Sequence, residues 1–330
     1  VEKVSCGIPF LSILKILGGA IKMKNGTVSV IIPCYNYGAF LGEAIESVLA
    51  QTLKPIEILI VDDASSDNTQ QVGLAYQKKY PGFITFHRNE KNMGIVDNFN
   101  NAVPMTSGEY ICFLGADNRF LPNYLELSAK VLDEDPSVGI AYTDYYLFGE
   151  QAKQVYDSHK ENRRGKIENG FYYINFPEFD LDEMKIGHNF IHGSSMYRRA
   201  AYEQVGGYKN QKAAPEDYNL FLRIVTSGWT ARKVHGTYLE YRQHSSEQAN
   251  RKVVEKAQLE YYKERLAYFE KEAKDLNEHW VRDVNELRAE IDRLTSLIAD
   301  KDRMIAEKDQ VILSLQNQSA LTFLRRKLKK

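Results

Sequence analysis

The sequence of 330 residues lacks an excess of either charge and contains only three cysteines. Its 43 basic and 44 acidic side chains nearly cancel, which argues against a general nucleic-acid binder, because such a protein needs basic residues to neutralise phosphates. Cys6, Cys34 and Cys112 are far apart and include no Cys-x-x-Cys pair, so neither a disulfide framework nor a structural zinc site is expected. We expect a reducing, cytoplasmic location, with Cys112 as a small core residue.

Long apolar runs are also missing. No run reaches the roughly 18 residues typical of a membrane-spanning helix, and the best candidate, residues 8–21, contains Lys15. A signal peptide is poorly supported, since no clear small-residue cleavage site precedes Met23. We interpret Met23 as a natural start, and residues 1–22 as accessory or foreign to the natural protein. Residues 1–26 are then an N-terminal extension.

From Val28 onward, apolar runs alternate with segments of helical periodicity. Strands are expected at 28–32, 56–61, 83–86, 110–114 and 193–197. Helices are expected at 40–51, 69–80, 95–105 and 199–205, and again after Pro215. Because the strands are apolar almost throughout and helices separate them, we expect an α/β fold with a mostly parallel sheet. Residues 148–189 look irregular, and we interpret them as an insertion or a substrate-facing lid.

Polar side chains follow three of the expected strands. They are Tyr35, Asn36, Asp62, Asp63 and Asp117. In parallel α/β sheets, ligands bind beyond the carboxyl ends of the strands. This convergence predicts a ligand site at that edge of the sheet.

Glycine and proline are absent from the last 80 residues. Apolar residues recur there at alternating spacings of three and four, over 259–280 and, after one extra residue, over 284–315. This pattern is typical of a coiled coil with a local phase shift, although Lys301 and Lys308 weaken its second part. A helix packed on its own domain explains 259–280 equally well. For 284–315 we expect self-association into a homo-oligomer.

The end of the chain, 320–330, combines five basic residues with a small apolar cluster. That composition suits docking on an anionic inner-membrane surface, where a lipid-linked acceptor would be found. A solvated end explains it equally well.

Six segments resemble the motifs of family 2 glycosyltransferases. They are 28–36, 44–52, 60–69, 92–94, 107–111 and 215–217. The resemblance runs from about 27 to 244 with the motifs in the family's order, and together they are specific. It implies a GT-A fold, which is Rossmann-like, over residues 27–250, followed by a helical or coiled-coil tail over 251–330.

The resemblance also implies a set of nucleotide-sugar contacts: Pro33, Tyr35, Asn36, Asp63, Gly94, Asn100, Ala116 and Arg242. Asp63 is expected to accept the imide N–H of uracil, and Pro33, Tyr35 and Asn36 to frame the base and ribose. Phe99 stands where the family often has arginine, so one donor contact is missing. A turn with a helix cap is the competing explanation for residues 62–67.

The metal motif departs from the family. Where Asp-Ala-Asp-Asp is common, this chain has Gly-Ala-Asp-Asn at 115–118, so only Asp117 remains as an acidic ligand. Binding of Mn²⁺ or Mg²⁺ through one carboxylate, donor phosphates and waters is chemically reasonable. A degraded site is the alternative. His244 is expected to complete the metal shell or contact the diphosphate, and Arg242 to neutralise the leaving group, unless both are simply exposed basic residues.

Glu216 and Asp217 match the family's catalytic acidic pair. The resemblance implies that Asp217 is the general base for the acceptor hydroxyl, and that Glu216 binds the acceptor or supports the loop. A capping role at a helix N-terminus is an alternative that is compatible with catalysis. His188, His192 and Trp229 are expected to be packing or acceptor-pocket residues rather than metal ligands.

Together these features predict an inverting, metal-dependent glycosyltransferase of polysaccharide biosynthesis. It would transfer a sugar from a nucleoside-diphosphate sugar, preferably a UDP-sugar, to a hydroxyl of a cell-surface or lipid-linked glycan. A catalytically inactive scaffold is one alternative, because acidic residues are lost and a coiled coil is present. A nucleotidyltransferase is another, although no Gly-rich, Lys-bearing phosphate loop is visible.

Overall fold

The computed structural model describes residues 26–158, 167–168, 171–185, 187–209, 215–244, 263, 288–301 and 303. These residues belong to two units, one up to Lys209 and from Asp217 to Gln243, the other comprising Asn210–Glu216 and the chain from His244. In the second unit, residues 288–301 are helical. The expected extension 1–22, the basic end 320–330 and most of the 284–315 coiled coil lie outside the described residues. None of the helices in the described ranges is long and apolar enough to cross a membrane.

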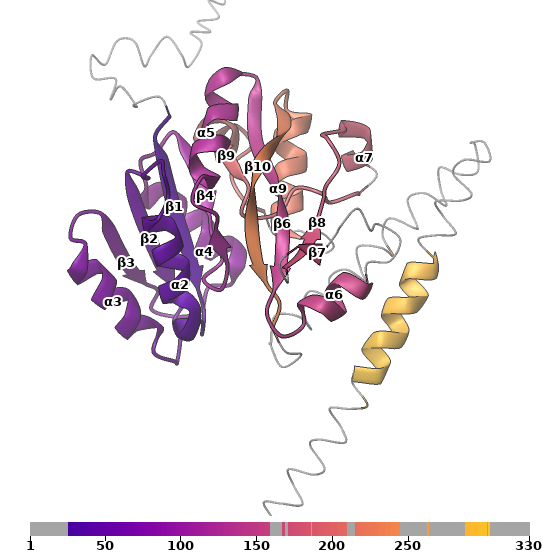
Figure 1. The fold of residues 1–330 in the computed structure, drawn as a ribbon, viewed down its shortest axis with the longest axis horizontal. Coiled ribbons are helices and arrows are strands. Elements are labelled where there is room, and N and C mark those ends of the chain that lie inside the picture. The colour runs from indigo at the N-terminus through magenta and orange to yellow at the C-terminus, as the bar shows by residue number, and fades with distance from the viewer. Residues whose placement is uncertain are drawn as a thin grey trace, which may run out of the picture. The chain divides into compact units, whose positions relative to one another are not determined.

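The described strands form one sheet in the first unit (Figure 1). Its strands are β1 (Val28–Cys34), β2 (Glu57–Asp62), β3 (Ile84–Arg88), β4 (Tyr110–Phe113), β5 (Arg119–Phe120), β6 (Val138–Phe148), β7 (Ile167–Glu168), β8 (Phe171–Ile174), β9 (Met196–Arg198) and β10 (Thr230–Arg242). The main order is β3-β2-β1-β4-β9-β6-β10-β5, and β8 pairs with β6 and β7. The pairs β2–β3, β1–β2, β1–β4 and β6–β10 are parallel, whereas β9 runs antiparallel to β4 and β6.

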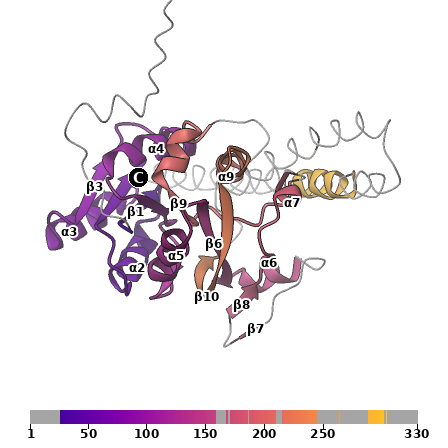
Figure 2. The same cartoon turned by 90° about the horizontal axis from the view of Figure 1, so that it is seen from above.

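Helices cover both faces of this sheet. They are α2 (Gly38–Leu49), α3 (Thr69–Lys79), α4 (Ile95–Ala102), α5 (Tyr124–Glu134), α6 (Ala152–Ser158), α7 (Leu181–Lys185), α8 (Arg199–Gln204) and α9 (Glu216–Thr226), with a 3₁₀ turn, η1, at Val103–Met105. Helices α2 and α5 lie on one face, and α4 and α9 on the other (Figures 1 and 2). The expected α/β fold is therefore confirmed, but the sheet is mixed rather than mostly parallel, because β5 also runs antiparallel to β10 and β8 runs antiparallel to β6 and β7.

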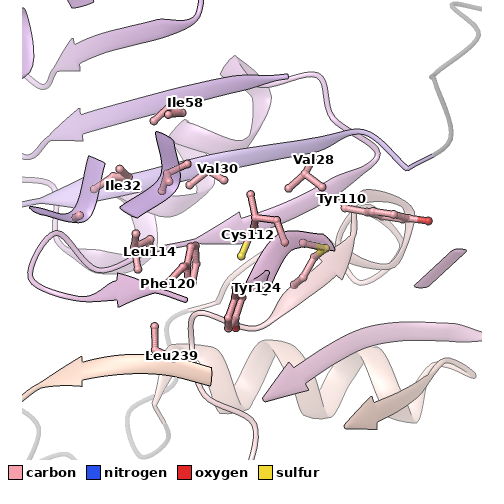
Figure 3. Close-up of a cluster of buried hydrophobic side chains, with 14 of the residues drawn as sticks. Val28, Val30, Ile32, Ile58, Tyr110, Cys112, Leu114, Phe120, Tyr124 and Leu239 are labelled. Carbon is pink, nitrogen blue, oxygen red and sulfur yellow. The ribbon is translucent and has the colours of Figure 1, made fainter. Parts of the chain in front are cut away.

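The apolar character of β1 follows from this double cover. Val30 and Ile32 join the cluster of buried side chains that also includes Tyr124 of α5 and Leu239 of β10 (Figure 3). Ile31, between them, is just as fully buried although its side chain points to the opposite face. A strand buried on both faces cannot alternate apolar and polar residues, which is why its sequence is apolar apart from Ser29, whose hydroxyl donates to Glu57.

The cysteines behave as the sequence suggested. Cys34 and Cys112 are free and buried within the same core, and burial raises the pKa of the Cys34 thiol to about 12 and raises that of Cys112 as well. Both are thus protonated, and they act as small apolar residues.

Several local expectations were wrong. The helix expected over 95–105 ends at Ala102 and continues as the η1 turn, because Pro104 lacks the N–H that a longer helix requires. The strand expected over 193–197 comprises only Met196–Arg198. The segment 148–189 is not irregular throughout, since it contains α6, α7 and β8, and β8 extends the sheet along β6.

Asp67 joins the beginnings of two helices at the carboxyl edge of the sheet. Its Oδ2 accepts the backbone N–H of Gly38 at 2.9 Å, and its Oδ1 accepts the backbone N–H of Thr69 at 3.0 Å. A Cβ at position 38 would lie 2.3 Å from Oδ1 of Asn68, so glycine is required for this close approach. One carboxylate therefore holds the N-termini of α2 and α3 together.

We predict that Asp67→Ala destabilises the protein, because both helices lose an acceptor at their first turn. An N-cap acceptor contributes about 0.5–2 kcal/mol, so the free energy of unfolding should fall by about 1–3 kcal/mol in urea unfolding at pH 7. Glu90→Ala, which removes an exposed acid, is the control. Equal stability of the two variants would contradict a double capping role.

The loss of stability caused by Asp67→Ala should also depend on pH. Desolvation alone would raise the pKa of Asp67, but hydrogen bonds from Thr69 and Gly38 lower it on balance. A carboxyl whose pKa is lowered on folding stabilises the protein above its unfolded pKa, and this stabilisation is lost as the pH falls through the folded pKa. The difference in the free energy of unfolding between the parent and Asp67→Ala should therefore become smaller below about pH 4. A difference that stays constant down to acid pH would refute this account.

Candidate functional site

The loops that follow β1 and β2 are joined to each other. Asn36 has a left-handed backbone (φ 59°), which asparagine tolerates better than most residues. Its backbone N–H donates to Oγ of Ser65 at 2.8 Å, and its Oδ1 accepts the backbone N–H of Ser66, also at 2.8 Å. Tyr35, next to it, is 41% exposed, whereas Pro33 is half-buried within β1. The structure thus presents Tyr35 at the open edge of the sheet.

Asp63, the expected uracil contact, is only 5% exposed. Its Oδ1 accepts Nδ2 of Asn89 at 2.8 Å and the backbone N–H of Met93 at 2.9 Å, and its Oδ2 accepts the backbone N–H of Gly94 at 3.1 Å. A carboxylate has about four acceptor positions, so Oδ2 can still accept a further donor. The first role of Asp63 is therefore to hold the 89–94 loop, and Gly94 (φ 77°) opens α4 from it.

Asn100 is engaged within the protein. Its Nδ2 donates to the carbonyl of Tyr208 at 2.9 Å, and its Oδ1 accepts the hydroxyl of Tyr202 at 2.7 Å and the backbone N–H of Tyr208 at 2.8 Å. Phe99, at the position where the family often has arginine, stacks on Phe113 with ring centroids 4.5 Å apart. Both residues fasten α4 to its surroundings, and a contact with the donor stays a prediction for Asn100.

Asp117 lies in the turn after β4, and its side chain is half-buried. The preceding Ala116 is 2% exposed, so that a ligand could meet little more than its backbone. Asn118 is also buried, and its Oδ1 accepts the backbone N–H of Arg242 at 3.0 Å. The Nε of Arg242 donates to the carbonyl of Asp117 at 2.9 Å. The end of β10 thus fixes the turn that presents the Asp117 carboxylate.

The guanidinium of Arg242 has several further partners. Its Nη2 donates to Glu43 of α2 at 2.6 Å, and its Cζ lies 4.7 Å from the ring centroid of Phe40 and 4.4 Å from that of Phe148. Arg119 approaches the same Phe148 ring at 4.2 Å and the same Glu43 at 3.2 Å. These contacts favour a positioning role for Arg242, and its contact with the leaving group stays a prediction.

Aromatic side chains extend from Asp117 towards β6. Burial raises the pKa of Tyr37, and the nearby carboxylate of Asp117 raises it further. Tyr241, which is 40% exposed, packs edge-on against Tyr145 with centroids 5.5 Å apart. Tyr145 in turn contacts Phe176 at 5.0 Å. This row of rings provides apolar faces beside a half-buried carboxylate.

Asp217 lies in the first turn of α9, and its side chain is half-buried. Its Oδ1 accepts the backbone N–H of Tyr218 at 2.7 Å. A Cβ at Gly193 would lie 3.1 Å from its Oδ2, so the carboxylate packs directly on the backbone of that glycine. Burial raises the pKa of the neighbouring Glu216. Glu216 and His244 belong to the second unit, and the pairing of His244 with Asp117 as metal ligands stays a prediction.

No group of three or more His, Cys, Asp or Glu side chains that could hold a metal occurs among the described residues. Among the acids at the carboxyl edge, Asp117 is the one that the family resemblance assigns to the metal, and its carboxylate is half-exposed. Mg²⁺ and Mn²⁺ are often held by one or two carboxylates together with substrate phosphates and waters. The residues present therefore fit a metal that binds with the donor diphosphate, rather than a cage made by the protein alone.

Sequence reasoning missed several residues that shape this edge, among them Tyr37, Glu43 and Asn89. Glu43 lies on α2 and meets Arg242 of β10 across 199 positions in the sequence. Asn89 holds Asp63 from the end of β3. No periodicity or short motif marks such long-range partners, so the sequence offered no signal for them.

Comparison with known proteins assigns these motifs to a family. The model described as Glycosyl transferase family 2 matches residues 29–206. An uncharacterized glycosyltransferase of Rickettsia typhi is 29% identical over 209 residues, which cover 62% of this chain and 61% of that protein. The putative glycosyltransferase EpsE of Bacillus subtilis is 28% identical over 63% of this chain and 70% of its own length. Chondroitin synthase of Escherichia coli is 28% identical over 61% of this chain, but only 27% of its own length is covered.

Solved structures share the fold. The crystal structure of S. aureus TarS 1–349 in complex with UDP superposes with a TM-score of 0.51 at 19% identity, covering 80% of this chain and 70% of TarS 1–349. At 19% identity this similarity supports a shared fold and nothing more specific.

Proposed function

The chain belongs to glycosyl transferase family 2, and from this premise we propose that it transfers a sugar from a nucleoside-diphosphate sugar to a hydroxyl of a glycan or lipid-linked glycan, with inversion. The observation that carries the proposal is the meeting of Tyr35, Asn36, Asp63 and Asp117 at the carboxyl ends of β1, β2 and β4. TarS was solved with UDP and with UDP-GlcNAc, which supports a UDP-sugar as the first donor to test. The chondroitin synthase match supports a glycan as acceptor.

In this proposal the nucleotide lies on the β1–β2 side of the edge. Tyr35 and Pro33 frame the base and ribose, Oδ2 of Asp63 accepts from the base, and Asn36 keeps the two loops in register. Asp217 takes the proton of the acceptor hydroxyl as that oxygen attacks the anomeric carbon, and the bond to the diphosphate breaks. Glu216, whose pKa burial raises, supports the acceptor side.

A divalent cation would be held by Asp117, with His244 as a second ligand, and would offset the charge of the departing diphosphate. The chain's own contribution is to fix Asp117. Arg242 holds the turn by donating its backbone N–H to Asn118 and its Nε to the carbonyl of Asp117, whose side chain is half-exposed.

Assaying a panel of nucleotide sugars with Mn²⁺ tests the proposal against its alternatives. Release of the nucleoside diphosphate supports glycosyl transfer. Release of pyrophosphate would identify a nucleotidyltransferase instead, and neither product would identify an inactive scaffold.

We predict that Asp217→Asn leaves UDP binding nearly intact while transfer falls by roughly 10²-fold or more, the scale of losing a general base. Asp97→Asn is the matched control, because Asp97 occupies the first turn of α4 and its loss removes a similar helix-dipole interaction. If both variants lose the same activity, Asp217 acts as a capping acid and not as a base.

For the metal, we predict that Asp117→Ala abolishes the part of UDP affinity that depends on Mn²⁺. In titration calorimetry with Mn²⁺, the variant should bind UDP roughly tenfold or more weakly than the parent, since a metal contact is worth several kcal/mol. Adding EDTA should weaken UDP binding by the parent but not by the variant. Asp182→Ala, at an exposed surface pair, should behave as the parent. An affinity that ignores both EDTA and the Asp117 change would refute the metal assignment.

We further propose that residues 284–315 make the protein a homo-oligomer and that residues 320–330 contact an anionic membrane surface. Within the described helix, Ile298 occupies a seam position and is only half-buried in the single chain, while Ser296 is exposed. Because a second copy could cover Ile298, Ile298→Asp should lower the mass measured by light scattering, and Ser296→Asp should not. A parent protein that is monomeric at micromolar concentration would contradict the coiled coil. Liposome binding unaffected by removal of 320–330 would contradict the membrane contact.

A further inference from the structure

His192 has one ring nitrogen that the described protein leaves without a partner. It belongs to the loop before β9, and its Nε2 lies 3.1 Å from Oγ1 of Thr143 on β6. The other nitrogen, Nδ1, is shielded from solvent and makes no hydrogen bond to any described residue. A buried polar atom without a partner costs about 1–3 kcal/mol, so a protein that retains one usually has a use for it.

The partners of Thr143 define the tautomer of His192. A threonine hydroxyl has a single hydrogen, and here it is directed to the carbonyl of Asp144 at 2.8 Å. With that hydrogen on the Asp144 carbonyl, Oγ1 of Thr143 accepts from His192, which assigns the ring hydrogen to Nε2. Nδ1 is then a bare lone pair, which is an acceptor that needs a donor.

The imidazole also stays neutral. Burial lowers the pKa of His192 to about 4, although a contact with the Thr143 backbone acts in the opposite direction. The lone pair of Nδ1 is thus unprotonated at neutral pH. A permanently neutral acceptor suits a hydroxyl or an amide N–H, and it does not suit a phosphate.

His192 lies near Asp217, the residue proposed to deprotonate the acceptor hydroxyl. The next residue, Gly193, packs on the carboxylate of Asp217, where a Cβ would lie 3.1 Å from Oδ2. The imidazole ring of His192 lies near two aromatic rings. Its centroid is 6.1 Å from that of Tyr145 and 6.5 Å from that of Phe176. Its hydrogen-bond partner is on β6, on the opposite side of β4 and β9 from the β1–β2 loops. Aromatic faces beside a neutral acceptor are the chemistry that binds a sugar through its C–H face and its hydroxyls.

We propose that Nδ1 of His192 accepts a hydrogen bond from a hydroxyl of the acceptor sugar, adjacent to the hydroxyl that Asp217 deprotonates, and that this contact selects the acceptor. The inference rests on the proposed function, because it assumes that Asp217 faces an acceptor. The residue as a whole is half-buried, and the inference requires that the side chains covering Nδ1 move aside as the sugar enters, while Nε2 keeps its contact with Thr143.

Two substitutions separate this role from a structural one. His192→Asn places an amide oxygen near the position of Nδ1 but cannot reach Thr143. His192→Gln places an amide nitrogen near the position of Nε2, where it can still donate to Thr143, but it lacks the acceptor at Nδ1. A purely structural histidine would be replaced better by glutamine, and an acceptor-binding histidine better by asparagine.

The probes are p-nitrophenyl glycosides, assayed with the UDP-sugar that the parent hydrolyses fastest. We expect His192→Gln to raise the KM for the best glycoside by roughly tenfold, the scale of one hydrogen bond, with the KM for the donor unchanged. His192→Asn should raise it less. His235→Gln, at an exposed histidine that pairs with Glu178, should match the parent. In ¹⁵N spectra of labelled histidine, the parent should show an unprotonated Nδ1 whose signal moves when the glycoside binds.

The outcomes are distinguishable. A parent that releases no nucleoside diphosphate from any nucleotide sugar of the panel, with or without glycosides, overturns the proposed function and this inference with it. A parent that hydrolyses the donor but shows equal acceptor KM values in all variants overturns the inference alone. The inference alone also fails if the glutamine variant outperforms the asparagine variant, or if no glycoside is used and none moves the Nδ1 signal.

Discussion

Carboxylates at and just after the end of β2 hold the loops at the carboxyl edge by accepting backbone N–H groups. Asp62 accepts the N–H of Ser65, Asp63 accepts those of Met93 and Gly94, and Asp67 accepts those of Gly38 and Thr69. Each acid reaches a different loop or helix end, and an unpaired N–H at any of these places would cost free energy. The stretch after β2 therefore sets the geometry of the β1, β2 and β3 side of this edge. The motif that it carries is a structural hub as well as a candidate binding element.

Motif residues of this family divide into those that build the fold and those that remain available to a ligand. Gly108 belongs to the first group, since a Cβ there would lie 2.5 Å from Oγ of Ser29, and the guanidinium of Arg199 donates to its carbonyl at 2.7 Å. Asn100 belongs there too, with its amide bonded to Tyr202 and Tyr208. Tyr35 stands in the second group by its exposure, and a ligand contact of the half-buried Asp117 stays a prediction. Motif membership alone does not separate the two groups, whereas hydrogen-bond partners and exposure do.

The sequence predicted the strands β1, β2 and β4 because their burial on both faces makes them continuously apolar. It did not reveal β6 as a strand, and the reason lies in its polar residues. Asp144 of β6 is 4% exposed and pairs with Lys233 of β10 at 2.9 Å, so each charge is balanced by a partner 89 positions away. Because a charged residue in a single strand is typical of an exposed position, the sequence of one strand does not reveal that its charge is buried against a partner on another strand. His192 shows the same limit, because its role depends on a hydroxyl of Thr143 that no local pattern connects to it.

The replacement of a common family aspartate by Asn118 bears on whether the metal site is degraded. Asn118 is 6% exposed, its Oδ1 accepts the backbone N–H of Arg242, and its Nδ2 lies so close to Gly115 that a Cβ there would come within 2.7 Å. A side chain used in this way serves the turn and has little opportunity to coordinate a cation. The half-exposed carboxylate of Asp117 is the group that could. The loss of an acid at position 118 is therefore compatible with an active site in which one carboxylate and the donor diphosphate share the metal.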